Sequence, residues 1–163
     1  MAPITLKGSC HCGSVQFTVE STSPVPYQLC LCSICRKVGG VGGSINLGGD
    51  AKSLDIKGAE NLSVYNAVLN RGTADERTAS SERNFCKRCS SMLWLYDKQW
   101  PELIHPFASA IDSPKLESPD TMLCIKLDSK PDYVRLPEGK KEEYSGYGPL
   151  SLAEWHKKNG YTY

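Results

Sequence analysis

The cysteines are the feature of this sequence that most restricts its fold. Eight occur among 163 residues, and seven of them fall into three tight groups. The groups are Cys10-His11-Cys12, Cys30-Leu31-Cys32-Ser33-Ile34-Cys35 and Cys86-Lys87-Arg88-Cys89, and Cys124 stands alone. A disulfide between cysteines so close in sequence would be strained, whereas two thiolates one or two residues apart can converge on one metal ion. The spacing therefore indicates metal binding.

Composition and charge define the class of protein that we expect. The formal net charge of +1 gives no electrostatic reason to expect a nucleic acid or a membrane surface as partner. No run of apolar residues approaches the roughly 18 needed to span a bilayer, and the first seven residues, 1–7, contain no apolar signal region. We therefore expect a cytoplasmic protein whose thiols stay reduced and whose partner is a small molecule. The sequence does not indicate an oligomeric state.

Two of the cysteine pairs are suited to a closed structural metal site. Such a site has four ligands, which commonly come as two pairs from distant segments. Cys10 and Cys12 with Cys86 and Cys89 meet this requirement. Metal bound there would join the start of the chain to its middle and stabilise the fold.

The middle group is informative because it holds three cysteines. Three protein ligands with an open fourth position are typical of a catalytic zinc, so Cys30, Cys32 and Cys35 are candidates for the active site. Two other interpretations stay open: Cys124 or a histidine closes the site, or one of the three is a packed core thiol. Cys124 itself lies in an apolar strand pattern, and we expect it to fill the core.

The rest of the chain shows short β patterns. Residues 14–20 alternate apolar and polar side chains, as a half-buried strand does. Further strand patterns cover 62–65, 92–96, 104–108 and 121–127. Pro106 would confine the strand at 104–108 to an edge or a bulge, and the polar segment 72–77 predicts a hairpin loop. Strands of this length and spacing favour an all-β sandwich or a partly open barrel.

Two short helices interrupt this pattern. One is predicted after Cys32 and would carry Cys35 until the glycine run 39–43 ends it. The other spans 151–160, where Ser151 and Glu154 form a capping box and Asn159-Gly160 ends the helix. We expect Trp155 of this helix to face the domain and His156 to be solvated.

Three segments carry a resemblance to a known family. They are Gly8 to Val15, Cys30 to Lys37 and Arg83 to Ser91, and they are similar to the motifs of the glutathione-dependent formaldehyde-activating enzyme family, also called the GFA or CENP-V/GFA domain. All seven grouped cysteines match in order and spacing. Residues 109–114 and 126–131 resemble later parts of the family pattern, and the tail 149–160 is similar to fungal members. The likeness implies one domain over 1–163, with a core of about 5–140 and a C-terminal extension of about 141–163.

The resemblance implies a fold and a function. The expected fold is mainly β, an Mss4-like antiparallel β-tent or sandwich with a short C-terminal helix and two zinc sites. Cys10, Cys12, Cys86 and Cys89 would hold the structural zinc, and Cys30, Cys32 and Cys35 the second zinc. The implied activity joins formaldehyde and glutathione into S-hydroxymethylglutathione, a carbon–sulfur lyase reaction with two zinc ions per chain and glutathione as co-substrate.

Several residues near the second group bear on substrate binding. Arg36 and Lys37 follow the third cysteine directly and can hold a substrate carboxylate, although solvated surface charges are an equal alternative. His11 lies between two ligands, so we expect its side chain to point away from that metal. Many family members have His and Asp where this chain has Leu31 and Ile34, and such an apolar surround suits a larger substrate. Aromatic residues that can line a pocket or pack in the core are Tyr65, Trp94, Trp100, Phe107 and Tyr147.

Three other functions remain compatible with this scaffold. The same site can serve a different reaction, such as an isomerisation, cyclisation or elimination on a secondary metabolite. A zinc fold of this kind can also act as a non-catalytic interaction module. A methionine sulfoxide reductase would need a reactive cysteine apart from the metal ligands, and the apolar context of Cys124 does not favour a low thiol pKa.

Overall fold

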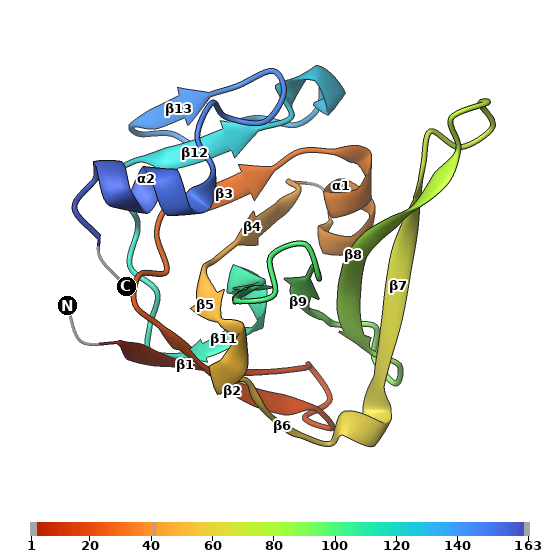
Figure 1. Cartoon of the computed structure of the whole chain (residues 1–163), viewed down its shortest axis with the longest axis vertical. Helices are drawn as coiled ribbons and strands as arrows, with labels where there is room; N and C mark the ends of the chain where they lie inside the picture. The colour runs from red at the N-terminus through yellow and green to blue at the C-terminus, as the bar shows by residue number, and fades with distance from the viewer. Residues whose placement is uncertain (1–2, 41, 162–163) are drawn as a thin grey trace.

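The computed structural model describes residues 3–40 and 42–161, and in this part of the chain thirteen strands form three sheets (Figure 1). The sheets enclose the core from different sides, and two short α-helices fill the corners between them. The expected mainly β fold with antiparallel sheets and a short C-terminal helix is confirmed.

The first sheet is antiparallel throughout and lies along the bottom of Figure 1. Its strand order is β11 (Ile111–Ser113), β1 (Ile4–Ser9), β2 (Gln16–Ser21) and β6 (Asp55–Lys57). In β2 the buried residues alternate with more exposed ones, as the period-two pattern predicted. The turn between β1 and β2 contains Cys10 and Cys12.

The second sheet is also antiparallel and contains the longest strands. Its order is β5 (Gly49–Asp50), β10 (Leu103–Pro106), β9 (Met92–Tyr96), β8 (Arg77–Cys86) and β7 (Leu62–Leu69). The tip of the β7–β8 hairpin, predicted at 72–77, projects from the body of the molecule (Figure 1). The edge position predicted for Pro106 is wrong, because β10 lies between β5 and β9. The proline is tolerated because it ends β10, and β5 pairs only with Leu103 and Ile104.

The third sheet departs from the antiparallel expectation. Its order is β13 (Lys141–Glu143), β12 (Met122–Ile125), β3 (Tyr27–Cys30) and β4 (Ser44–Asn46). β12 runs parallel to both β3 and β13, and only the β3–β4 pair is antiparallel. Parallel neighbours need a long connection instead of a tight hairpin, and residues 126–140 provide one between β12 and β13.

Two cores hold these sheets together. The larger core joins the first and second sheets, where the Phe17 and Trp94 rings meet edge to face with 5.1 Å between centroids. A smaller core lies at the third sheet and contains Leu29, Leu31 and Cys124. Cys124 is fully buried there, which confirms its predicted role as core filler.

Both predicted helices are present, α1 (Ser33–Gly39) and α2 (Leu152–Lys158). Short 3₁₀ turns occur at Ala51–Ser53, Ala59–Asn61, Ala108–Ala110 and Leu127–Ser129. The capping box of Ser151 and Glu154 forms as predicted, and Gly160 after the helix has a φ of +77°. Neither helix has the length and apolar character needed to cross a bilayer.

The solvated position predicted for His156 is wrong. Its side chain is fully buried, and its Nε2 is hydrogen-bonded to the carbonyl of Val25, just before β3. The helix pattern did not reveal this contact because Val25 lies 131 residues earlier in the chain. Burial lowers the pKa of His156, so the ring is neutral in the folded protein at neutral pH.

This buried histidine makes stability dependent on pH. The unfolded chain binds a proton below its ordinary pKa of about 6.5, whereas the folded chain resists protonation, so the free energy of unfolding falls as the pH drops below that value. We expect His156 to contribute a fall in the free energy of unfolding between pH 7.5 and 6.0, because the unfolded histidine takes up its proton in that range. His156→Gln should remove this contribution and lower stability by about 1–3 kcal/mol at pH 7.5, measured by urea unfolding. Lys157→Gln, an exposed neighbour on α2, should keep the wild-type slope.

Candidate metal centres and active site

Four sulfurs from distant segments meet at the first candidate centre. Cys10 and Cys12 come from the turn after β1, and Cys86 and Cys89 from the end of β8 and the following turn. All four sulfurs lie within 4.8 Å of one another. The Cys12 sulfur is 3.5 Å from that of Cys10 and 3.8 Å from that of Cys86. A metal at 2.3 Å from four tetrahedral sulfurs needs sulfur separations of about 3.8 Å, so the group fits a tetrahedral metal ion.

Local turns aim these sulfurs at one point. After Cys10, Gly13 has a φ of +71° and its N–H donates to the Cys10 carbonyl at 2.9 Å. After Cys86, the N–H of Ser90 donates to the Cys86 carbonyl at 2.8 Å. Ser91 joins the two turns, because its hydroxyl accepts a hydrogen bond from the His11 N–H at 3.0 Å. The two turns differ in size, with a span of three residues after Cys10 and four after Cys86, but each folds back onto the carbonyl of its first cysteine.

The thiols of this cluster differ in proton affinity. Burial raises the pKa of Cys10 to about 11. Hydrogen bonding to the side chain and backbone of Ser91 lowers the pKa of Cys89 to about 5. Metal ligands must be deprotonated, so a cation is needed before all four sulfurs can be thiolates together.

The second candidate centre lies where β3 ends and α1 begins (Figure 1). Cys30 ends β3, Cys32 caps α1 and Cys35 lies in its first turn. The Cys32 sulfur accepts a hydrogen bond from the Cys35 N–H at 3.4 Å, so the ligand also starts the helix. The three sulfurs lie within 4.8 Å of one another, and in the described part of the chain no other cysteine or histidine joins the group. Cys32 is the most exposed of the three.

The glycine run after α1 is required by close packing against this centre. Gly43 has a φ of +82°, and a Cβ there would lie 2.3 Å from the Cys30 carbonyl oxygen. A Cβ on Gly39 would meet the Ser44 hydroxyl at 2.0 Å. These two glycines let the chain turn from α1 into β4 beside β3. Val41 of the predicted run lies outside the described residues.

The three thiols of this group differ in pKa. Hydrogen bonds from Cys30 and Cys35 lower the pKa of Cys32 to about 2. The same contacts, with burial, raise the pKa of Cys30. For Cys35 the Cys30 contact lowers the pKa, but the contact with Cys32 and burial together raise it to about 11. The most exposed sulfur of the group is thus the one that ionises first.

Lys126 and Tyr147 flank this centre. The sequence analysis did not predict that Lys126 would lie there. The Lys126 N–H donates to the Gly146 carbonyl at 2.8 Å, and its ammonium group lies 5.4 Å from the centre of the Tyr147 ring. Desolvation of its hydroxyl and the negative charge of Cys30 and Cys32 raise the pKa of Tyr147. The Lys126 ammonium also forms an ion pair with Asp128 at 3.1 Å.

Arg83 is a further neighbour that sequence reasoning missed. It comes from the middle of β8 and is 5% exposed. Its positive charge acts to lower the pKa of Cys35, an effect that the contact with Cys32 and burial outweigh. Arg83 is 48 residues from Cys35 in sequence, so only the tertiary structure brings them together.

The residues predicted to hold a substrate carboxylate have different surroundings. Arg36 is partly buried, and its Nε donates to the Leu31 carbonyl at 3.0 Å. Lys37 is exposed. Their contact with a substrate stays a prediction.

Leu31 and the aromatic residues are explained mainly by packing. Leu31 is fully buried in the smaller core, so its apolar character serves that core. Ile34 is partly buried on α1. Trp94 and Phe107 belong to the larger core. Of the five aromatic residues considered for a pocket, Tyr65, Trp100 and Tyr147 are exposed, and among them Tyr147 interacts electrostatically with the second centre.

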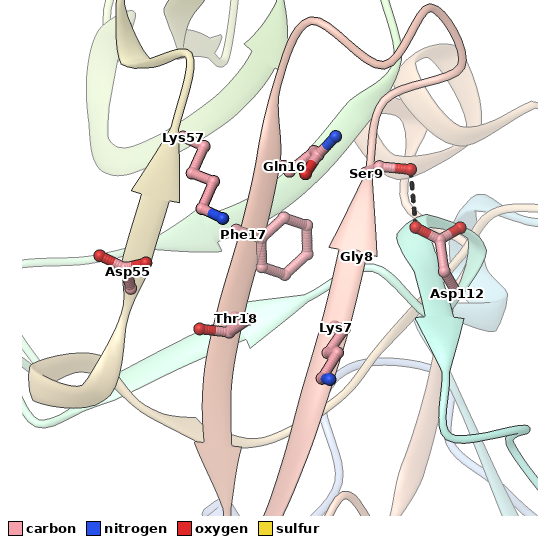
Figure 2. Close-up of a pocket in the computed structure, with 9 residues that line it drawn as sticks. All are labelled: Lys7, Gly8, Ser9, Gln16, Phe17, Thr18, Asp55, Lys57 and Asp112. Carbon is pink, nitrogen blue, oxygen red and sulfur yellow. Dashed lines mark hydrogen bonds between the residues drawn. The ribbon is translucent and has the colours of Figure 1, made fainter.

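Two cavities lie away from the three-cysteine group. A cavity of about 330 Å³ on the first sheet is lined by charged and polar residues that include Lys7, Lys57 and Asp112 (Figure 2). There Asp112 accepts a hydrogen bond from Ser9, next to Cys10, at 2.6 Å (Figure 2). A second cavity, of about 520 Å³, is lined by His11 and Ser109 among others. The segment 109–114 thus supports the turn that carries the first centre.

Comparison with known proteins identifies the family. Residues 5–126 match the family described as "Glutathione-dependent formaldehyde-activating enzyme". The chain belongs to this family. It is 48% identical over 157 residues to a Halomonas elongata protein named "Putative glutathione-dependent formaldehyde-activating enzyme", covering 95% of this chain and 96% of that protein. A crystal structure of a Rhodobacter sphaeroides protein aligns with a TM-score of 0.49 and 25% identity, over 67% of this chain and 90% of the other.

From the two candidate centres we predict the number of metal ions that each chain binds. We expect two metal ions per chain by elemental analysis after purification without chelators, because each sulfur group fits one ion. Cys32→Ser should reduce the content to one ion and leave the protein folded.

Cys124→Ala provides the matched control, since this cysteine lies in the adjacent smaller core and outside both groups. It should keep two ions. A wild-type content of one ion, unchanged by Cys32→Ser, would contradict a second centre.

Proposed function

We propose that the chain is a zinc-dependent carbon–sulfur lyase that joins glutathione and formaldehyde into S-hydroxymethylglutathione and cleaves this adduct. The observation that carries the proposal is the group of Cys30, Cys32 and Cys35, which provides three sulfur ligands and no fourth from the described chain. This donor set is typical of a zinc site with a position for substrate. The family and the name of the Halomonas elongata relative support glutathione and formaldehyde as the substrates.

Zinc is the metal that best suits these ligands. Sulfur-only, tetrahedral donor sets favour zinc or iron–sulfur centres over magnesium, calcium or manganese. We assign Cys10, Cys12, Cys86 and Cys89 to a structural zinc and Cys30, Cys32 and Cys35 to a catalytic zinc. Bound there, zinc would lower the pKa of a thiol so that it ionises at neutral pH.

The residues around the second centre would bind and orient the thiol substrate. Cys32 is the more exposed sulfur, so substrate would approach from its side. Lys126 lies on that side and remains protonated, because its pKa is raised by the hydrogen bond to Asp128. Its ammonium group can exchange Asp128 for a substrate carboxylate, and Tyr147 can contact the peptide part. Arg36 and Lys37 remain alternative carboxylate ligands.

The reaction is an addition that balances without a redox partner. The thiol loses its proton to solvent, and its sulfur forms a bond to the carbonyl carbon of formaldehyde. The carbonyl π electrons move to the oxygen, which takes up a proton and becomes the hydroxymethyl group. In the reverse direction the carbon–sulfur bond breaks and thiolate leaves. Holding the two bound reactants in position supplies most of the expected increase in reaction rate.

The free thiols and the packing of the C-terminal segment support proposals for the compartment and the domain organisation. All eight cysteines are free thiols in the structure, and such thiols persist in a reducing cytosol. We therefore propose a cytoplasmic location and one domain over 1–163. The extension after residue 140 belongs to this domain, because β13 pairs with β12 and His156 contacts Val25.

The activity can be measured as the exchange rate between free glutathione and its hydroxymethyl adduct by NMR. The wild-type protein should accelerate this exchange in proportion to its concentration, and Cys32→Ser should abolish the acceleration because the open centre loses a ligand. Cys124→Ala should retain it. Full activity of Cys32→Ser would exclude the second centre as the active site.

The KM for glutathione distinguishes the two candidate contacts for its carboxylate, Lys126 and Lys37. If Lys126 binds glutathione, Lys126→Met should raise KM for glutathione about tenfold with little change in kcat, since one charged hydrogen bond contributes about 1.5 kcal/mol. Lys37→Met should then leave KM unchanged, and the reverse result would favour the contact predicted from sequence. Lys98→Met, on an exposed turn, controls for loss of surface charge.

A further inference from the structure

One side of β7 is open. The strand is eight residues long and ends the second sheet, and among the described residues only β8 pairs with it. In Figure 1 it runs along the outer margin of the molecule and extends with β8 beyond the body. Val64 and Tyr65, which point to opposite faces of the strand, are 48% and 40% exposed. An unpaired edge of this length offers a row of free N–H and C=O groups to another chain.

The backbone hydrogen bonds show which residues of β7 face the open side. The Asn61 carbonyl, just before the strand, accepts from the Lys87 N–H at 2.9 Å and so points toward the β8 side. The next residue, Leu62, is opposite Cys86, whose N–H donates away from β7 to the Ser91 carbonyl at 2.9 Å. Because these directions alternate along a strand, the even-numbered residues of β7 direct their N–H and C=O groups to the open side.

The strand lacks the features that usually keep an edge from pairing. Charged side chains, proline and bulges are the common protections of an edge strand, and Leu62–Leu69 contains neither a charge nor a proline. The irregularity near Asn66 places its extra residues on β8 and not on β7. The Asn66 amide donates to the carbonyls of Ala79 and Ser81 at 3.3 and 3.1 Å, so it holds that irregularity on the inner side. The open edge of β7 therefore stays regular.

The charges beside β7 favour a second copy of this chain as its partner. Glu60 precedes the strand and Arg71 follows it, and both are exposed. When two copies of a strand pair antiparallel, the start of one lies beside the end of the other. Glu60 of each copy would then lie near Arg71 of the other. The uncharged strand between them brings no like charges together.

We propose that two copies of the chain associate through β7, antiparallel and about a two-fold axis at Tyr65. Val64 of one copy would lie opposite Asn66 of the other, and both direct their backbone groups across the interface. The two Tyr65 side chains would meet at the axis as a non-hydrogen-bonded pair, in which opposite side chains are closest. Such an aromatic pair stabilises adjacent strands. The two five-stranded sheets would become one continuous sheet across the dimer.

The test is analytical ultracentrifugation of the full-length, metal-loaded protein over a range of concentrations. The wild type should form a dimer whose population rises with concentration. Tyr65→Lys and Tyr65→Glu should each raise the dissociation constant about tenfold or more, because like charges then meet at the axis. An equimolar mixture of these two variants should restore the dimer, since opposite charges meet instead. Trp100→Lys, which changes another exposed aromatic residue, should match the wild type.

A backbone variant tests the edge independently of side-chain charge. Val64→Pro removes an N–H that points to the open side and leaves the hydrogen bonds between β7 and β8 in place. It should keep the wild-type metal content and circular dichroism spectrum but lose the dimer. If Val64→Pro does not fold, the mixture of the two Tyr65 variants decides the question.

Three results would overturn the proposal. The first is a wild type that stays monomeric at every concentration, including one that binds extended peptides of other sequence. The second is a dimer that Tyr65→Lys and a folded Val64→Pro leave unchanged. The third is a mixture of Tyr65→Lys and Tyr65→Glu that stays monomeric, because the two copies of Tyr65 would then not face each other.

Discussion

Sulfur atoms packed within 4.8 Å of one another cannot all be negatively charged unless a cation lies among them. The requirement for a cation applies to both sulfur groups, and each group joins separate segments of the fold. The four-cysteine group joins the β1–β2 turn to the end of β8, and the three-cysteine group joins the end of β3 to α1. Because each group links segments that are otherwise held by turns, a metal ion bound there would couple metal binding to folding.

The two cores give the sulfur groups a firm support. The larger core, with its Phe17–Trp94 contact, fixes the first sheet against the second and so fixes the distance between the two turns of the four-cysteine group. The smaller core holds Leu31 between Cys30 and Cys32. A polar side chain at that position would need a hydrogen-bond partner inside this core, which accounts for the apolar residue there.

Local patterns in the sequence were sufficient for the local features. Close spacing predicted both sulfur groups, period-two alternation predicted β2, and the capping box predicted α2, because each depends on residues a few positions apart. Contacts between distant segments were not predictable in this way. The burial of His156 depends on Val25, the burial of Arg83 on how β8 packs, and the position of Lys126 on the pairing of β12 with β3. The parallel direction of β12 was also missed, since alternation does not reveal strand direction.

That parallel direction has a consequence for how relatives can diverge. The chain leaves β3 and β12 at the same end of the third sheet, so the three-cysteine group and the segment after Ile125 meet there. Tyr147 belongs to this segment but lies beyond residues 5–126, the part that matches the family. Changes in residues 127–147 can therefore alter the surroundings of Cys32 while the segments that carry the seven grouped cysteines stay the same. In this architecture the wall beside the three-cysteine group and the group itself are encoded by different stretches of sequence.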